Sequence, residues 1–222
     1  MMDSLIEKEE KDVVGLPRIG SPAPQFEAVT TQGTLRLEDF KGSWVILFSH
    51  PADFTPVCTT EFMAFAQMHP KLRELNCELF GLSIDSVYSH IAWVRNIEEK
   101  MGQKIDFPVI ADLNKDVAQK YGMIMPEESQ TETSRCVFII DDKQIIRAII
   151  YYPLTTGRNT EEILRLLKAL QTTDEHGLAT PANWQPGDKL IIPPPQTQEM
   201  AEERIAGKEG ECTDWYFCKK KL

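Results

Sequence analysis

The sequence has no long apolar run and no targeting segment of a familiar kind. None of its residues lies in a stretch of about 18 or more apolar residues, which is the length that a membrane-crossing helix needs. Residues 1–12 also lack the basic start and the apolar stretch of about 7–15 residues that mark a secretory signal. We therefore expect a cytoplasmic protein that makes no contact with membranes.

Positive charge is scarce as well. The 24 Lys and Arg residues are outnumbered by 34 Asp and Glu residues, which gives a formal net charge of −10. The densest basic run consists of the lysines at residues 219–221, and it is too short to follow a nucleic-acid backbone. The composition therefore argues against nucleic acid as a partner.

Cysteines are few, and their number is odd. A chain of 222 residues can bury a core large enough to fold without disulfide bonds, so its five cysteines do not indicate a structural disulfide framework. They are expected to be either reactive or buried. Cys77 and Cys136 each begin an apolar run, and packing is the expected role of both.

The apolar pattern predicts strands that alternate with helices. Residues 44–48 form a continuous apolar run bounded by Gly42 and Pro51, which is typical of a strand buried on both faces. A helical pattern follows at residues 59–75, and a hairpin pattern covers residues 136–152. This alternation indicates an α/β layered domain.

The composition divides the chain into three parts. Residues 1–14 form an acidic N-terminal segment, and the alternation of strands and helices covers residues 15–171. Prolines interrupt residues 172–222, and the pattern of a single core is lost there. This last part is predicted to be an arm that docks on another surface.

The segment that leads to Cys58 carries the clearest chemical signal. A loop with two prolines, Pro51 and Pro56, connects the buried strand to a helix that starts near the cysteine. The free N–H groups and the positive dipole end of a first helical turn favour a thiolate, which is the nucleophilic form. Thr55 lies three residues earlier, where its hydroxyl can reach the sulfur or a bound substrate oxygen. The ordinary alternative is that Cys58 is a small buried hydrophobic residue.

This segment resembles the active-site signature of the peroxiredoxins. The resemblance covers roughly residues 15–195, with its motifs in order. The last motif is similar to that of the subfamily with a long C-terminal dimerisation arm, often called the 1-Cys type. The matching strings are Pro51-x-x-x-Thr55-x-x-Cys58, Arg135 before a strand, Tyr152-Pro153 with Gly157-Arg158, and Thr180-Pro-Ala-Asn-Trp184-Gln-Pro-Gly-Asp188.

The resemblance implies a fold and an activity. The fold would be thioredoxin-like, a mixed central sheet flanked by helices, with a C-terminal dimerisation arm. The activity would be that of a thiol peroxidase in antioxidant defence, which reduces hydrogen peroxide and organic hydroperoxides through a sulfenic acid at Cys58. No cofactor is needed, because sulfur itself carries the two electrons. Homodimers formed by arm exchange, and rings of five dimers, are the expected assemblies.

The resemblance also assigns roles to residues near the sulfur. Thr55 would position the peroxide, and Pro51 would shield the intermediate from water. Arg135 would favour the thiolate and bind a peroxide oxygen, and Arg158 resembles a second arginine near this site. His50 lies in the same pocket in members with this local sequence. The ordinary alternatives are a surface charge for Arg135 and a satisfied core histidine for His50.

The tail contains Cys212 and Cys218, separated by five residues around an aromatic cluster. This pair resembles the C-terminal pair of archaeal and related bacterial members. It implies that Cys218 resolves the sulfenic acid of the partner subunit, that Cys212 then forms a second-stage disulfide with Cys218, and that a thioredoxin-type dithiol regenerates the enzyme. A zinc site is disfavoured by the spacing and by the lack of a nearby histidine. A redox-silent tail with an external thiol as resolver stays open.

Other functions fit the sequence less well. A dithiol reductase needs a second cysteine at position 61, which is Glu61. A cysteine hydrolase with His50 as base lacks an apparent group to orient the histidine. The string at residues 81–85 lacks the final glycine of a Gly-x-Ser-x-Gly hydrolase motif. A structural or holdase assembly has no support beyond the expected oligomerisation.

Overall fold

The computed structural model describes residues 16–207 and 210–222, so the predicted segment 1–14 lies outside the described residues. Seven strands form one sheet in the order β2-β1-β5-β4-β3-β6-β7. These strands are β1 (Glu27–Thr30), β2 (Gly33–Arg36), β3 (Trp44–Ser49), β4 (Cys77–Ser83), β5 (Val109–Ala111), β6 (Arg135–Ile140) and β7 (Ile146–Tyr152).

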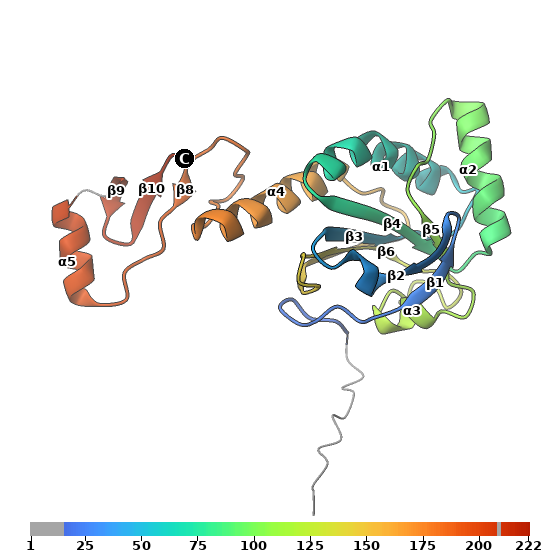
Figure 1. The fold of residues 1–222 in the computed structure, drawn as a ribbon, viewed down its shortest axis with the longest axis horizontal. Helices are drawn as coiled ribbons and strands as arrows, with labels where there is room; N and C mark the ends of the chain where they lie inside the picture. Colours follow the sequence, from blue (N-terminus) through green and yellow to red (C-terminus); the bar gives the residue numbers. More distant parts are fainter. Residues whose placement is uncertain (1–15, 208–209) are drawn as a thin grey trace, which may run out of the picture.

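The sheet is mixed. Strands β3, β4 and β5 run parallel to one another, whereas β6, β7 and the β1–β2 hairpin pair antiparallel with their neighbours. Helices cover both faces (Figure 1). The mixed sheet and its flanking helices confirm the predicted α/β class. The helices of the main domain are η1 (Leu37–Phe40), α1 (Pro56–Glu74), α2 (Val87–Met101), α3 (Asp116–Lys120) and α4 (Thr160–His176).

The central strand β3 is buried on both faces, as its apolar run predicts. Ile46 and Phe48 point into the core shared with α1, α2 and α4, whereas Val45 and Leu47 point into the core shared with η1 and α3. This alternation follows from the two-residue period of a strand. The strand therefore ends, at Ser49, in the middle of the domain rather than at its surface.

Helix α1 starts three residues earlier than the predicted range 59–75. Pro56 occupies the beginning of the helix, where its missing N–H costs nothing and its fixed φ fits a helix. Thr55 before it has extended backbone angles, φ −104° and ψ 146°. As a result Cys58 lies in the first turn, where the backbone N–H groups have no helical acceptor.

Helix α4 links the main domain to the tail. Asn159 caps its start by accepting a hydrogen bond from the backbone N–H of Glu162. The predicted division between residues 171 and 172 falls within α4 and stays a prediction. Beyond α4, Trp184 and Leu190 pack against Ala169 on the helix.

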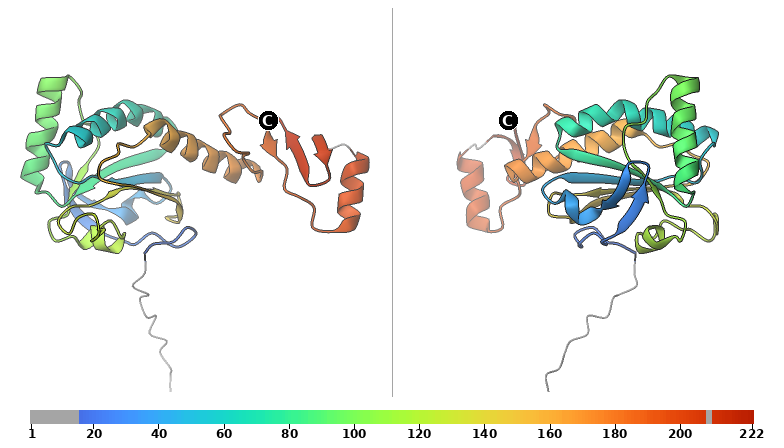
Figure 2. Two further views of the ribbon diagram at one scale, coloured as in Figure 1. Left: turned by 180° about the vertical axis from the view of Figure 1, so that it is seen from behind. Right: turned by 45° about the vertical axis from the view of Figure 1, so that its right-hand side comes forward.

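The tail forms a small sheet of its own. It contains β8 (Leu190–Ile191), β9 (Glu211–Asp214) and β10 (Phe217–Lys220) in the order β8-β10-β9, together with α5 (Gln198–Gly207). Figures 1 and 2 show this sheet and α5 beyond the end of α4, away from the main sheet. Among the described residues, no helix combines the length and the apolar character that crossing a bilayer requires.

Candidate active site

Cys58 is fully buried in the first turn of α1. Its Sγ accepts a hydrogen bond of 3.3 Å from Nη1 of Arg135, the first residue of β6. A guanidinium is always charged at neutral pH, so the sulfur faces a permanent cation inside the protein. The structure thus brings together two residues that the sequence places 77 positions apart.

Glu61 joins this pair to a second arginine. Its carboxylate accepts a hydrogen bond of 2.7 Å from Arg135 Nη1 at Oε2. The same carboxylate accepts three hydrogen bonds from Arg158, namely from the backbone N–H and Nε at Oε1 and from Nη2 at Oε2, at 2.7–2.9 Å. One carboxylate therefore fixes the direction of both guanidinium groups next to the sulfur.

The side chain of Arg158 contacts backbone carbonyl oxygens and aromatic rings as well as Glu61. Its Nη1 donates to the backbone carbonyl oxygens of Ser49 and Cys136, each at 2.8 Å. Its guanidinium carbon lies 5.2 Å and 5.3 Å from the ring centroids of Phe48 and Phe65, within cation–π distance. Four of its five side-chain N–H donors are thus used within the protein, and its side chain is 0% exposed.

The charges of this cluster decide the ionisation of Glu61. Burial raises the pKa of a carboxyl group, but the ion pairs with Arg158 and Arg135 outweigh burial and hold the pKa of Glu61 below its ordinary value. With Glu61 ionised, the buried cluster contains two positive charges and one negative charge. The cluster therefore keeps one unbalanced positive charge next to the Cys58 sulfur.

Thr55 and Pro51 lie in the loop that precedes α1. The hydroxyl of Thr55 donates to the carbonyl oxygen of Ala52 at 2.9 Å, so its lone pairs are left to accept from another donor. Pro51 is buried, and Thr55 is half-buried. Thr55 therefore directly precedes the first turn of α1 as its N-cap residue.

His50 belongs to a buried trio with Asp53 and His90. Asp53 Oδ1 lies 3.0 Å from His50 Nε2, and Asp53 Oδ2 lies 2.8 Å from His90 Nδ1. The ring atom His90 Nε2 is 3.1 Å from the carbonyl oxygen of Ile110. Burial lowers the pKa of His50, whereas the two histidines together lower the pKa of Asp53 in spite of burial.

The trio corrects one part of the sequence interpretation. A group that orients His50 does exist, namely Asp53, and its position three residues after His50 was the signal that could have found it. However, His50 Nδ1 has no hydrogen-bond partner among the described residues, so it accepts no hydrogen bond from the Cys58 thiol, as a general base would.

The ligand atoms of His50, Asp53 and His90 lie within 4.8 Å of one another, close enough to share a metal ion. Hydrogen bonds between the Asp53 carboxylate and the rings of His50 and His90 satisfy the same atoms without a metal ion.

The remaining cysteines divide into two kinds. Cys77 and Cys136 are buried, and burial raises the pKa of both thiols, that of Cys136 to about 12. They stay protonated at neutral pH, which fits the packing role predicted for them. Cys212 and Cys218 form a disulfide bond in the tail, and Cys218 is buried while Cys212 is exposed. This is the pairing that the resemblance of the tail implies for the second-stage disulfide.

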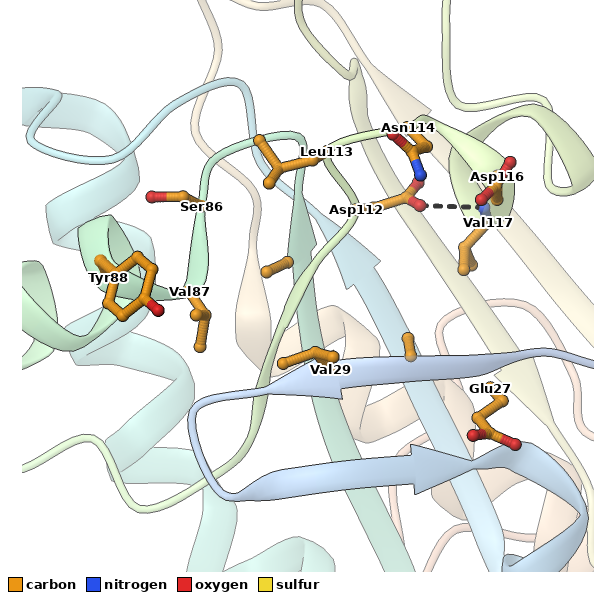
Figure 3. A pocket seen from close by; sticks show the side chains of 12 residues that line it. Glu27, Val29, Ser86, Val87, Tyr88, Asp112, Leu113, Asn114, Asp116 and Val117 are labelled. Atoms are coloured by element: carbon orange, nitrogen blue, oxygen red, sulfur yellow. Dashed lines mark hydrogen bonds between the residues drawn. The ribbon is translucent and has the colours of Figure 1, made fainter.

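A separate hollow lies between the β1–β2 hairpin and the start of α2 (Figure 3). Its lining contains Tyr88 and Asp112 but none of the predicted site residues. Both oxygens of Asp112 accept hydrogen bonds from α3, from the backbone N–H groups of Val117 and Ala118. The Asp112 carboxylate therefore caps the start of α3 and is already used in hydrogen bonds to the backbone.

Comparison with known protein families agrees with this geometry. Residues 19–149 match the model of the AhpC/TSA family, and residues 169–208 match the C-terminal domain of 1-Cys peroxiredoxin. The chain is 58% identical over 223 residues to a peroxiredoxin of Aquifex aeolicus, covering 95% of this chain and 100% of the relative. It is 52% identical to a peroxiredoxin of Methanocaldococcus jannaschii, covering 93% and 100%.

Solved structures give the same result. A yeast mitochondrial 1-Cys peroxiredoxin, studied for thiol resolution by glutathione and thioredoxin systems, matches with a TM-score of 0.81 and 41% identity. The match covers 93% of this chain and 100% of that one. A 2-Cys peroxiredoxin of Plasmodium vivax matches with a TM-score of 0.72 and 32% identity, over 78% and 92% of the two chains. The fold is therefore thioredoxin-like, as predicted.

The first prediction concerns the buried carboxylate. Glu61→Gln leaves two buried guanidinium groups without their shared anion, and we expect it to lower the free energy of unfolding by about 3–5 kcal/mol. Glu162→Gln is the matched control, because Glu162 pairs with Arg165 at the surface and should lose less than about 1 kcal/mol. Urea denaturation of both variants measures the difference, and equal losses would contradict the role given to Glu61.

The second prediction concerns acid stability. The pKa values of His50, Asp53 and Glu61 are all lower in the folded protein than their ordinary values of 6.5, 3.8 and 4.5. The unfolded chain therefore binds more protons, and stability should fall as the pH drops below 6.5, by at most about 1.4 kcal/mol per pH unit for each group.

Denaturant midpoints at pH 7.5, 5.5 and 4.5 test this slope. His50→Gln should flatten the change between pH 7.5 and 5.5, whereas His176→Gln, which alters an exposed histidine, should keep it. A midpoint that rises on acidification would show that the sign is wrong.

Proposed function

This chain belongs to the peroxiredoxin family, and we propose that Cys58 is the thiolate with which it reduces hydrogen peroxide and organic hydroperoxides. The observation that carries the proposal is the hydrogen bond from Arg135 to Cys58 Sγ inside a buried cluster of net positive charge. Of the three free cysteines, Cys58 alone accepts a hydrogen bond from an arginine in the described part of the chain. A thiolate is the form that attacks a peroxide.

The proposed reaction transfers one oxygen atom to sulfur. The Cys58 thiolate attacks one peroxide oxygen, an S–O bond forms, and the O–O bond breaks. The other oxygen leaves with the electron pair and takes up a proton, so that water or an alcohol is released and the sulfur becomes a sulfenic acid. Negative charge moves from sulfur to the leaving oxygen during this step, and Arg135 stabilises it there.

The loop residues have supporting roles in this proposal. Thr55 accepts the hydrogen bond of the peroxide hydroxyl, because its own proton is already given to Ala52. Pro51 closes the loop over the sulfur and keeps water away from the sulfenic acid. Arg158 positions Glu61 and, through it, Arg135. His50 shapes the pocket wall, where its ring contacts Phe62 at 4.7 Å between centroids.

We further propose that Cys218 of the partner subunit resolves the sulfenic acid. Helix α4 starts next to Arg158 and has 17 residues, so its far end lies about 25 Å from the active site. The tail begins beyond that end (Figure 2). Cys58 and the tail of the same chain are therefore far apart. This distance favours attack on the sulfenic acid by Cys218 of a second chain over attack by Cys218 of the same chain.

The resolving steps conserve atoms and electrons. The Cys218 thiol condenses with the sulfenic acid, which forms a disulfide bond and releases water. The Cys212 thiolate then attacks the Cys218 sulfur, and Cys58 leaves as a thiolate ready for another peroxide. The Cys212–Cys218 disulfide of the tail is the product of this step.

A thioredoxin-type dithiol is the proposed reductant of that disulfide. The yeast mitochondrial 1-Cys peroxiredoxin, which is 41% identical to this chain, has its thiol resolved via glutathione and thioredoxin systems. Three free cysteines and one reducible disulfide fit a reducing compartment, so we propose the cytoplasm as the location and antioxidant defence as the role.

The proposed assembly is a homodimer joined by the arms, with rings of five dimers as the larger form. Large apolar side chains are exposed on the tail, at Trp215 and Tyr216, and on the main domain, at Phe54 and Tyr88. Two separate apolar surfaces are what an assembly with two kinds of interface needs.

The third prediction tests Arg135. Arg135→Ala removes the donor to sulfur and to the transferred charge, so the rate constant for hydrogen peroxide should fall about 100- to 1,000-fold. Arg147→Ala is the control, because Arg147 pairs with Asp174 near the end of α4, at the opposite end of that helix from Arg158, and should leave the rate unchanged. Stopped-flow fluorescence measures both, and equal rates for the two variants would exclude Arg135 from the reaction.

The fourth prediction tests the resolver. One equivalent of hydrogen peroxide should produce a dimer band on a non-reducing gel of Cys212→Ser protein, in which Cys218 has no second partner. When added to the Cys212→Ser protein, Cys218→Ser should abolish the band, whereas Cys77→Ser, which alters a buried packing residue, should keep it. A dimer band that persists in Cys218→Ser would move the resolving role to another thiol.

A further inference from the structure

The two sulfurs of the tail disulfide differ sharply in their surroundings. Cys212 lies on β9, whose four residues are all exposed, whereas Cys218 lies on β10 and is 0% exposed. We propose that the reductant attacks the sulfur of Cys212 and that Cys218 is the leaving group. This inference rests on the proposed function only for the role of the disulfide in the catalytic cycle.

The strand order explains the difference in exposure. Strand β10 is central and pairs with β8 on one side and β9 on the other, so both of its edges are covered. The carbonyl oxygen of Cys218 accepts a hydrogen bond of 2.9 Å from the backbone N–H of Ile192, next to β8. Strand β9 is an edge strand of this sheet, and its outer side is open.

The geometry of thiol–disulfide exchange makes this difference matter. The attacking sulfur approaches along the line of the S–S bond, on the side opposite to the leaving sulfur. Attack on Cys218 would have to come through the covered side of β10, where residues such as Leu190 are buried. Attack on Cys212 comes from the exposed side of β9.

A hollow in the surface of the tail adjoins Cys212. Cys212 lines it together with Arg204 and Ile205 of α5 and Asp214 of β9. Arg204 contributes one positive charge to this lining and the carboxylates of Glu211 and Asp214 contribute two negative charges, of which Glu211 is paired with Lys189. The exposure of Cys212, and not the charge of the hollow, therefore directs the attack.

The reduction proceeds in two balanced steps. A thiolate of the reductant bonds to Cys212 Sγ, the bond to Cys218 breaks, and its electron pair leaves with Cys218 as a thiolate that takes up a proton. The Asp214 carbonyl oxygen, 3.5 Å from Cys218 Sγ, can accept the resulting S–H. A second thiol of the reductant then attacks the mixed disulfide and releases Cys212 as a thiolate.

Glutathione is a suitable probe, because as a monothiol it leaves a mixed disulfide that can be located. Full-length Cys58→Ser protein is oxidised with diamide, mixed briefly with glutathione, quenched in acid and alkylated with N-ethylmaleimide. Peptide mass mapping should find glutathione on Cys212 and maleimide on Cys218, in excess of the reverse pattern by about tenfold or more. The same protein in concentrated guanidinium chloride should show a ratio near one, because both sulfurs are then exposed.

Three outcomes would overturn the inference: glutathione mainly on Cys218, an even split in the folded protein, or no Cys212–Cys218 disulfide after diamide. The result does not depend on peroxidase activity, because the protein used lacks Cys58. A peroxide assay of the wild-type protein is therefore a separate test. Loss of the proposed function there, with glutathione still on Cys212, would leave this inference standing.

Discussion

The site depends on one buried carboxylate. Glu61 accepts four hydrogen bonds from two arginines and lies one helical turn after Cys58, so it fixes where positive charge meets the sulfur. Two guanidinium groups without this anion would repel each other in a site closed to water. With it, Arg135 still has an N–H for the sulfur, and the cluster keeps one unbalanced positive charge.

The order of strands places these groups together. Strand β3 lies between β4 and β6, so the loop that leaves β3 and enters α1 faces the start of β6, where Arg135 lies. Arg158 arrives just before α4, the helix that packs beside α1. The same helix then carries the chain away to the tail. One arrangement therefore surrounds the Cys58 sulfur with charged groups and carries Cys212 and Cys218 away from it.

Much of the chemistry could be predicted from the sequence, because the proline-rich loop and the helix start are local features around Cys58. The role of Glu61 could not be predicted, because its partners Arg135 and Arg158 lie 74 and 97 residues later in the sequence. Only the folded sheet brings them close to Glu61. The pairing of Asp53 with His50 is local and could have been found from the sequence, but its second partner, His90, lies 37 residues later and could not. The unequal exposure of Cys212 and Cys218 follows from the strand order β8-β10-β9. The spacing of the two cysteines in the sequence does not predict this order.

The buried cluster should make Cys58 the cysteine that peroxide oxidises. The most direct measurement treats reduced Cys212→Ser, Cys218→Ser double-variant protein with one equivalent of hydrogen peroxide in the presence of dimedone, which traps sulfenic acids, followed by peptide mass mapping. We expect the adduct on Cys58, with Cys77 and Cys136 unmodified, because burial keeps those thiols protonated. An adduct on either of the other two, or none on Cys58 in folded protein, would contradict this assignment.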